Sequence, residues 1–128
     1  MQDLMKPPSK EPCIRLVMLP KYTNPDGDIF GGVILSMIDE AAAVEAQRQA
    51  RHRYVTVSMD SIQFHHPVQV GDIISLWCRT VKIGRTSICI HVEVRANPRW
   101  SGSEQKVTEA IVTMVAIDQS RQPVPILA

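Results

Sequence analysis

The sequence has no apolar stretch long enough to cross a membrane and no segment that resembles a secretory signal. The longest nearly apolar stretch, residues 29–46, is interrupted by four polar or charged side chains, Ser36, Asp39, Glu40 and Glu45. A membrane-spanning helix needs about 20 predominantly apolar residues in a row. Residues 1–12 also lack the apolar segment of a signal peptide. We therefore expect a cytoplasmic protein with no membrane partner.

An excess of charge of either sign is also absent. The 14 basic and 13 acidic residues give a formal net charge of +1, and no run of basic residues is longer than two. Nucleic-acid-binding proteins usually carry a basic patch or stripe, so we expect no nucleic-acid partner. Recognition of an anionic ligand must then depend on a few individually placed cations.

Cysteines are few and odd in number. Cys13, Cys78 and Cys89 follow no spacing typical of a disulfide framework or a metal site. We interpret them as reduced, mostly buried thiols, which fits a reducing compartment. The sequence therefore predicts no metal and no cofactor.

A length of 128 residues, 45% of them hydrophobic and 21% charged, is typical of one globular domain. Residues 1–12 are polar and rich in proline, which predicts a flexible N-terminal tail. Residues 13–128 are expected to form the single domain. Within it, residues 21–32 are dense in turn-forming residues, including Asn-Pro, Asp-Gly and Gly-Gly pairs, and indicate a structured loop.

A helix is predicted over residues 33–50, which are rich in strong helix formers and contain no proline or glycine. Its first half is apolar on almost every side and is expected to be buried. Its second half is polar and is expected to emerge into solvent; its polar residues are Glu45, Gln47, Arg48 and Gln49.

Alternation of apolar and polar residues predicts strands on both sides of this helix. The predicted strands cover residues 13–19, 54–64, 72–82, 86–95 and 106–117. Long strands joined by short turns form an antiparallel sheet, and a helix with little polar surface is satisfied when that sheet wraps around it. The pattern therefore predicts an α+β protein with the hotdog fold. An open sheet with a helix on one face fits the pattern almost as well.

Several motifs, in this order, resemble one known family. They are NPDGDIFGG at residues 24–32, MIDEA at 37–41, VTV at 55–57, FHHP at 64–67, VGD at 70–72, GRTS at 84–87 and TEA at 108–110. Together they resemble the bacterial acyl-CoA thioesterases of the YciA type and the eukaryotic brain-type acyl-CoA hydrolases. The similarity extends over residues 16–125.

The resemblance implies a hotdog protein that cleaves acyl-CoA to a free carboxylic acid and CoA without a metal. It also implies that Asp39 is the catalytic carboxylate, that Asn24 reaches it from a neighbouring subunit, and that residues 84–87 face the CoA phosphates. Many bacterial members have an uncharged residue where this chain has Glu40.

Apart from the resemblance, the residue types themselves are suited to thioester hydrolysis. A carboxylate on an otherwise buried helix, such as Asp39, can act as a general base or as a nucleophile, or it can be a purely structural acid. Gly31 and Gly32 precede the predicted helix, where free N–H groups and the helix dipole can polarise a carbonyl, although a plain turn would also use glycines. Asn24 can orient water or the carbonyl, and Glu40 is expected to have a structural or interface role.

The turn at residues 84–87 offers a place for phosphates. Arg85, Thr86 and Ser87 follow Gly84 and can hold CoA phosphate groups, with Lys82 and Arg53 as further cations, although basic residues at turns are often only solvated. His65 and His66 are adjacent on a predicted strand and point to opposite faces, so we interpret them as structural or substrate-lining residues.

Three functions compete on this basis. The preferred one is an acyl-CoA thioester hydrolase; the alternatives are a non-catalytic acyl-CoA-binding hotdog module and a hydroxyacyl thioester dehydratase. A dehydratase usually has a histidine in a loop before the helix, and this chain has none there. A single hotdog leaves a sheet edge unpaired, so we expect a homodimer, with further assembly into a tetramer or hexamer left open.

Overall fold

The computed structural model describes residues 5–127. It contains one long helix, α1 (Gly31–Gln49), a short 3-10 helix, η1 (Pro20–Tyr22), and five strands. The strands are β1 (Ile14–Val17), β2 (Arg53–Phe64), β3 (Ile73–Ile83), β4 (Ser87–Asn97) and β5 (Gln105–Ile117). The predicted order of one strand, one helix and four strands is confirmed, and α1 begins at Gly31, ahead of the predicted residue 33.

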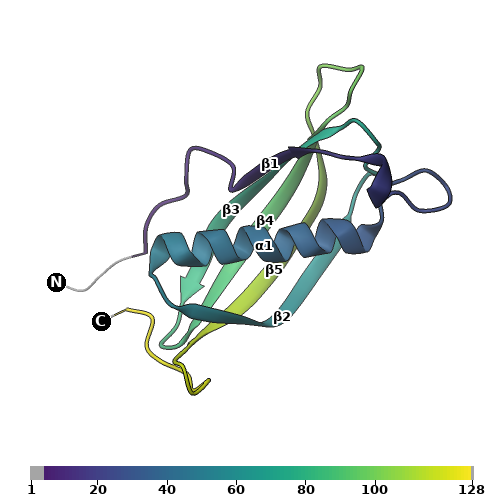
Figure 1. The fold of residues 1–128 in the computed structure, drawn as a ribbon. Helices are drawn as coiled ribbons and strands as arrows, with labels where there is room; N and C mark the ends of the chain where they lie inside the picture. The colour runs from purple at the N-terminus through teal and green to yellow at the C-terminus, as the bar shows by residue number, and fades with distance from the viewer. Residues whose placement is uncertain (1–4, 128) are drawn as a thin grey trace.

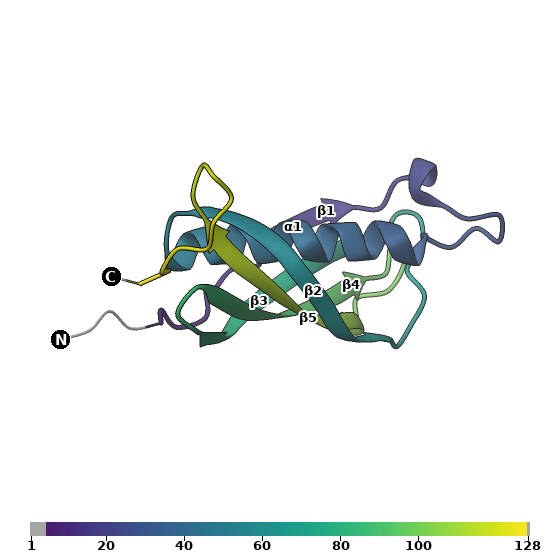
Figure 2. The same ribbon diagram turned by 90° about the horizontal axis from the view of Figure 1, so that it is seen from below.

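The five strands form one antiparallel sheet in the order β1-β3-β4-β5-β2. The sheet curls around α1, which lies across its inner face (Figure 1), and the view from below shows the strands crossing beneath the helix (Figure 2). The wrapped sheet, and not the open one, is therefore the architecture of this chain. Its two edges are β1, which is short, and β2, which is long.

The core lies between α1 and the inner face of the sheet. On β4 the alternation seen in the sequence holds, because Ile88, Ile90, Val92 and Val94 are fully buried while the intervening side chains are half-buried. On α1 the small residues Ala41, Ala42 and Ala46 are also fully buried, which allows the helix to approach the sheet closely.

The prediction that the second half of α1 emerges into solvent is wrong for two residues. Glu45 is fully buried and Gln49 is 7% exposed. Glu45 accepts hydrogen bonds from Arg48 Nε (2.8 Å), Thr80 Oγ1 (2.6 Å) and Gln49 Nε2 (3.1 Å). A buried charge is tolerated when it is paired and hydrogen-bonded. Here Thr80 on β3 donates a hydrogen bond in addition to those from Arg48 and Gln49 on the helix.

These contacts also affect the titration of Glu45. Burial by itself raises the pKa of this carboxyl group, but the hydrogen bonds from Arg48, Thr80 and Gln49 outweigh burial and hold the pKa below its usual value. Glu45 therefore stays ionised inside the protein at neutral pH, and we call this group of four residues the Glu45 cluster.

The described part of the N-terminal segment lies against the end of α1. The Lys6 N–H donates to Gln49 Oε1 at 2.7 Å, and Arg48 Nη2 donates to the Pro7 carbonyl oxygen at 2.8 Å. Residues 1–4 lie outside the described part of the chain. The flexibility of the tail and the boundary at residue 13 stay predictions.

All three cysteines are free; Cys78 is buried, and Cys13 and Cys89 are half-buried. Over residues 5–127, no helix has the length and apolar character needed to cross a membrane. The cytoplasmic location stays a prediction from the sequence.

Candidate active site

The start of α1 is uncapped within the described chain. Phe30 occupies the N-cap position and provides no side-chain hydrogen bond to the first turn. The first N–H groups of a helix lack intrahelical carbonyl partners, so the amides of Gly31 and Gly32 are available as donors at the positive end of the helix dipole.

The two glycines at this helix start are not required by the backbone. The glycines with positive φ in the described chain are Gly27 and Gly71, so Gly31 and Gly32 have ordinary φ angles. A Cβ built on Gly32 would meet nothing within 4 Å, whereas one on Gly31 would lie 3.3 Å from the ring of Phe64. The missing side chain at Gly32 therefore leaves open space in front of the helix amides, where a ligand can approach them.

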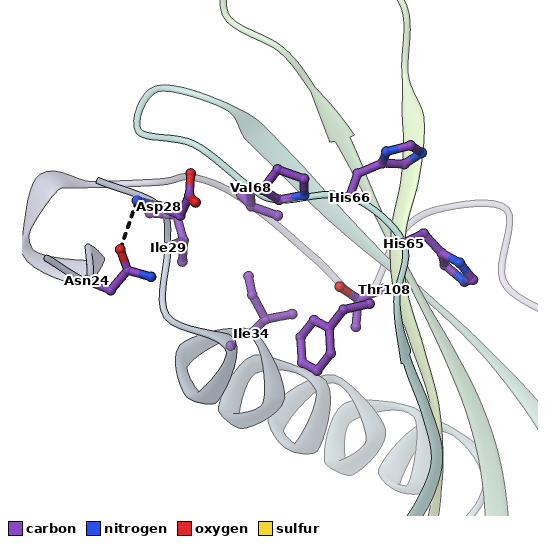
Figure 3. A pocket seen from close by; sticks show the side chains of 11 residues that line it. Asn24, Asp28, Ile29, Ile34, His65, His66, Val68 and Thr108 are labelled. Carbon is purple, nitrogen blue, oxygen red and sulfur yellow. Dashed lines mark hydrogen bonds between the residues drawn. The ribbon is translucent and has the colours of Figure 1, made fainter. Parts of the chain in front are cut away.

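Asn24 lies in the loop that leads to this helix start, and its side chain shapes that loop. Its Oδ1 accepts hydrogen bonds from the backbone N–H groups of Asp26 (2.9 Å) and Asp28 (3.1 Å), one of which is drawn in Figure 3. Because the carbonyl half of the amide is engaged, the NH₂ half is the part left to act on a ligand.

A cavity of about 290 Å³ opens between this loop, the first turn of α1 and the segment after β2. Asn24, Gly31 and Ile34 line it from the loop and the helix, and Phe64 and Val68 line it from the end of β2 and the segment that follows. Figure 3 shows Asn24, Ile34 and Val68 around this space. The cavity therefore joins two of the predicted site elements, the Asn24 loop and the Gly-Gly helix start.

Asp39 lies further along α1 and does not line this cavity. Its carboxylate is half-buried and its Oδ1 accepts a hydrogen bond of 2.6 Å from Thr56 Oγ1 on β2. At a rise of about 1.5 Å per residue, Asp39 is about 10 Å along the helix axis from Gly32. Within one copy of the chain, Asp39 is therefore too far from Asn24 and Gly32 to act at the same site.

Thr56 is a residue that the chemical reasoning from sequence missed as part of the site. It belongs to the VTV motif and adjoins a β-bulge, because the register between β2 and β5 shifts between Thr56 and Ser58. Bulges often re-aim side chains beside active sites. The hydrogen bond from Thr56 orients one carboxylate oxygen of Asp39 and leaves the other free.

The predicted phosphate turn is well ordered by its own contacts. The Gly84 N–H donates to the Ser87 carbonyl oxygen at 2.8 Å, and a Cβ on Gly84 would lie 2.8 Å from Ser87 Oγ, so a side chain at Gly84 would displace the Ser87 hydroxyl. Arg85 and Lys82 are exposed, which leaves both cations available to a ligand.

This turn is at the end of the molecule opposite the cavity. The Ile126 N–H donates to the Arg85 carbonyl oxygen, and His52 Nε2 is 2.8 Å from the carbonyl oxygen of Ile126, which ties the turn to the segment that follows the C-terminal end of α1. From Gly32 to Gln49 the helix measures about 26 Å. Within one copy, the predicted phosphate residues and the helix start are thus not brought together.

His65 and His66 both line the cavity, and His65 also belongs to an ionic cluster on the outer side of the sheet. His65 Nε2 is 2.9 Å from Glu109 Oε2, His91 Nε2 is 3.1 Å from Glu109 Oε1, and Lys106 Nζ is 2.7 Å from Glu109 Oε2. Lys106, His91 and His65 lower the pKa of Glu109 to about 2. This arrangement agrees with a structural and cavity-lining role for His65.

Comparison with known proteins gives consistent matches. The model of the thioesterase superfamily matches residues 26–99. An uncharacterised acyl-CoA thioester hydrolase of Zymomonas mobilis is 48% identical over 91% of this chain and 78% of its own length. The acyl-CoA thioester hydrolase YciA of Salmonella typhimurium is 39% identical over 93% of this chain and 92% of its own.

The fold is also found among solved structures. A hexameric hotdog-fold thioesterase of Campylobacter jejuni superposes with a TM-score of 0.84 at 44% identity, covering 91% of this chain and 90% of that one. This likeness confirms the hotdog fold predicted from the sequence. Together with the curved sheet, the uncapped helix start and the half-buried helix aspartate, these matches show that the chain belongs to the thioesterase superfamily, among the hotdog-fold acyl-CoA thioester hydrolases.

Proposed function

We propose that this chain hydrolyses acyl-CoA thioesters to a free carboxylic acid and CoA, at a site completed by a second copy of the chain. The observation that supports a shared site is that the groups needed for the reaction are far apart within one copy of the chain. Asn24 and the helix start at Gly31 line the cavity, while Asp39 is about 10 Å along the helix from Gly32.

Asp39 is proposed as the group that drives the attack on the thioester carbonyl. As a general base it takes a proton from water, whose oxygen bonds to the carbonyl carbon; CoA then leaves as the thiolate and is protonated. As a nucleophile it attacks the carbonyl carbon itself, and water cleaves the resulting anhydride. Both routes consume one water and release one acid and one CoA. The hydrogen bond from Thr56 fixes the carboxylate for either route.

The helix start is proposed to hold the negative charge that forms on the carbonyl oxygen. Asn24 and Gly31 line the cavity, and the amide N–H of Gly32 follows in the same first turn of α1. Preorganised donors of this kind contribute strongly to acyl transfer. The lack of a side chain at Gly32 keeps the approach to the amide open.

Strand β2 is proposed as the contact between two copies. It is an edge strand of 12 residues and carries three exposed apolar side chains, Val57 (56% exposed), Ile62 (38%) and Phe64 (52%). A long exposed edge is a liability that pairing removes, and a two-fold axis is the commonest way to pair it. Thr56, the partner of Asp39, lies on this same edge.

Pairing along β2 would place the Asn24 loop of one copy beside the helix of the other. The relative from Campylobacter jejuni is described as hexameric, so we propose that dimers of this chain assemble further into a hexamer. The cations of the phosphate turn, Arg85 and Lys82, are proposed to bind CoA phosphates.

A mixing experiment tests the hydrolysis and the shared site together. Asn24→Ala and Asp39→Asn should each hydrolyse butyryl-CoA at least 100 times more slowly than the wild type when CoA release is followed with a thiol reagent. Refolding the two variants together at equal concentration gives mixed dimers in roughly half of the pairs, each with one intact site, so activity should recover to about a quarter of wild type.

Glu40→Gln is the matched control, because Glu40 is the exposed carboxylate adjacent to Asp39, and it should keep full activity. If subunit exchange is demonstrated by mass spectrometry and no activity returns, the shared site is wrong. If the wild type binds butyryl-CoA and releases no CoA, the chain is a binding module instead.

A further inference from the structure

The inner face of β5 is apolar except at one position. The side chains that face α1 from this strand are Thr108, Ala110, Val112, Met114 and Ala116, and all five are buried. Thr108 is fully buried, and its Oγ1 has no hydrogen-bond partner in the described chain. Buried hydroxyl groups nearly always have a partner, so an unpartnered one requires an explanation.

The second buried threonine on the inner face shows what a structural role looks like. Thr80 on β3 is 4% exposed, and its Oγ1 donates to Glu45 at 2.6 Å and accepts from Gln49 at 3.1 Å. Both hydrogen-bonding capacities of Thr80 are used within the protein. Thr108 is buried to the same degree at the other end of the helix, and neither of its capacities is used.

The Thr108 hydroxyl is directed into the 290 Å³ cavity at the start of α1. Thr108 is one of the residues that line this cavity, and in Figure 3 its oxygen atom points toward the space bounded by Ile29, Ile34 and Val68. These three neighbours are aliphatic, and the polar side chains of the lining are Asn24, Asp28, His65 and His66. The Thr108 hydroxyl therefore lies in the wall of the cavity without a hydrogen-bond partner in the described chain.

Thr108 and the helix start belong to the same cavity. Thr108 pairs directly with Phe64 in the β2–β5 register, and the ring of Phe64 reaches to 3.3 Å from the Cβ position of Gly31. Gly31, Phe64 and Thr108 all line the cavity. An acyl chain whose carbonyl is held at the helix start would therefore extend into the cavity that Thr108 lines.

We propose that this cavity binds the acyl group of the substrate and that Thr108 selects short acyl chains with a hydroxyl or oxo group on the β or γ carbon. The hydroxyl of threonine both donates and accepts, so it can pair with either group. A site built to hydrogen-bond such a group disfavours the analogue that lacks it, because its own polar atom is then left buried without a partner. This inference rests on the proposed acyl-CoA hydrolysis.

The size of the cavity agrees with a short chain. Its volume of about 290 Å³ is at the lower end of the roughly 300–1,000 Å³ of small-molecule pockets, and it suits a short group such as hydroxybutyryl.

The test compares kcat/KM for butyryl-CoA, 3-hydroxybutyryl-CoA and 4-hydroxybutyryl-CoA. The wild type should prefer one of the hydroxylated substrates over butyryl-CoA by about tenfold, the scale of one hydrogen bond. Thr108→Val keeps the shape of the side chain and removes the hydroxyl. It should lower kcat/KM for the hydroxylated substrate, raise it for butyryl-CoA and so abolish or reverse the preference, while Thr108→Ser should retain it.

Thr113→Val is the matched control, since Thr113 is on the same strand but, by strand alternation, on the outer face; it should leave the ratio unchanged. Thr108→Val should also melt no lower than the wild type, because it removes an unpartnered polar group. A lower melting temperature with an unchanged ratio would identify a buried structural water as the partner of Thr108 and overturn the proposal. Equal hydrolysis of all three substrates by the wild type would overturn the selectivity alone, whereas absence of any hydrolysis would also refute the proposed function.

Discussion

The two ends of α1 differ in how their polar groups are satisfied. At the C-terminal end, the Glu45 cluster is closed, because the carboxylate, the Thr80 hydroxyl and the Gln49 amide all bond to one another. At the N-terminal end, the helix amides are uncapped and the Thr108 hydroxyl is buried without a partner. The closed end satisfies its polar groups within the fold, whereas the open end keeps donors that the described chain does not use.

The two helix carboxylates show the same contrast. Glu45 is fully buried and receives four side-chain hydrogen bonds from three residues, while Asp39 is half-buried and receives one. A carboxylate whose partners are all inside the fold contributes to stability, and a half-buried one with a single partner in the described chain is available for chemistry. Replacing each carboxylate in turn should therefore separate catalysis from folding.

The largest expected effect is on catalysis at Asp39. Asp39→Asn should lower kcat for acyl-CoA hydrolysis by two or more orders of magnitude, since it removes the carboxylate proposed to take a proton or attack the carbonyl. The free energy of unfolding, measured by urea denaturation, should change by less than about 0.5 kcal/mol because the site is half-exposed. Near-wild-type kcat in a normally folded variant would remove Asp39 from the mechanism.

The next effect is on stability at Glu45. Glu45→Ala should lower the free energy of unfolding by about 2–4 kcal/mol, because it leaves Thr80 and Gln49 buried without their acceptor and removes the partner of Arg48. Urea denaturation measures this loss, and hydrolysis by the fraction that stays folded should remain close to that of the wild type. A loss of kcat as large as that of Asp39→Asn would show that the two ends of the helix are not independent.

A smaller effect is expected at the phosphate turn. Arg85→Ala should raise KM for acyl-CoA about three- to tenfold with kcat little changed, which is the signature of binding lost equally from substrate and transition state. The effect should shrink as ionic strength rises, because Arg85 is exposed and its attraction to phosphate is screened. Arg15→Ala is a suitable control, since Arg15 lies on the edge strand β1, outside the phosphate turn, and donates to Ser75 Oγ. A fall in kcat with unchanged KM would instead assign Arg85 to the chemical step.

Much of the fold could be predicted from the sequence because the strands are regular. The strict alternation in β4 and the absence of proline and glycine from residues 33–50 identify their elements without tertiary information. The start of α1 was placed two residues late because glycine has a low helix propensity, although Gly31 and Gly32 are in the helix. The position of the helix start matters for the proposed function of these glycines, because the amides of the first helical residues are the ones without a carbonyl partner in the helix.

The hydrogen-bond partners of the buried polar side chains could not be predicted from the sequence in the same way. The environment of Glu45 depends on Thr80, which is 35 positions away in the chain, so local pattern placed Glu45 in solvent. The half-exposure of Asp39 and the empty hydrogen-bonding position at Thr108 likewise arise from the packing of separate strands against the helix. The motifs MIDEA and TEA include Asp39 and Thr108, but they do not indicate which hydrogen bonds these side chains leave unmade. The roles assigned to Asp39, Asn24 and the phosphate turn stay predictions.

The smallest expected effect is the pH dependence of the closed end. The pKa of Glu45 in the folded protein is below its ordinary value of 4.5, so its ionised form adds stability that is fully present above the unfolded pKa and is lost as pH falls through the folded one. Glu45→Gln removes this contribution. The difference in unfolding free energy between wild type and Glu45→Gln, measured by urea denaturation, should therefore be constant from pH 7 to about 5.5 and should shrink below about pH 4.5. Glu40→Gln, at an exposed carboxylate, should show no such convergence with the wild type. A difference that widens on acidification would mean that the buried carboxyl group is more stable protonated, and that the closed end of the helix is held by packing and not by charge.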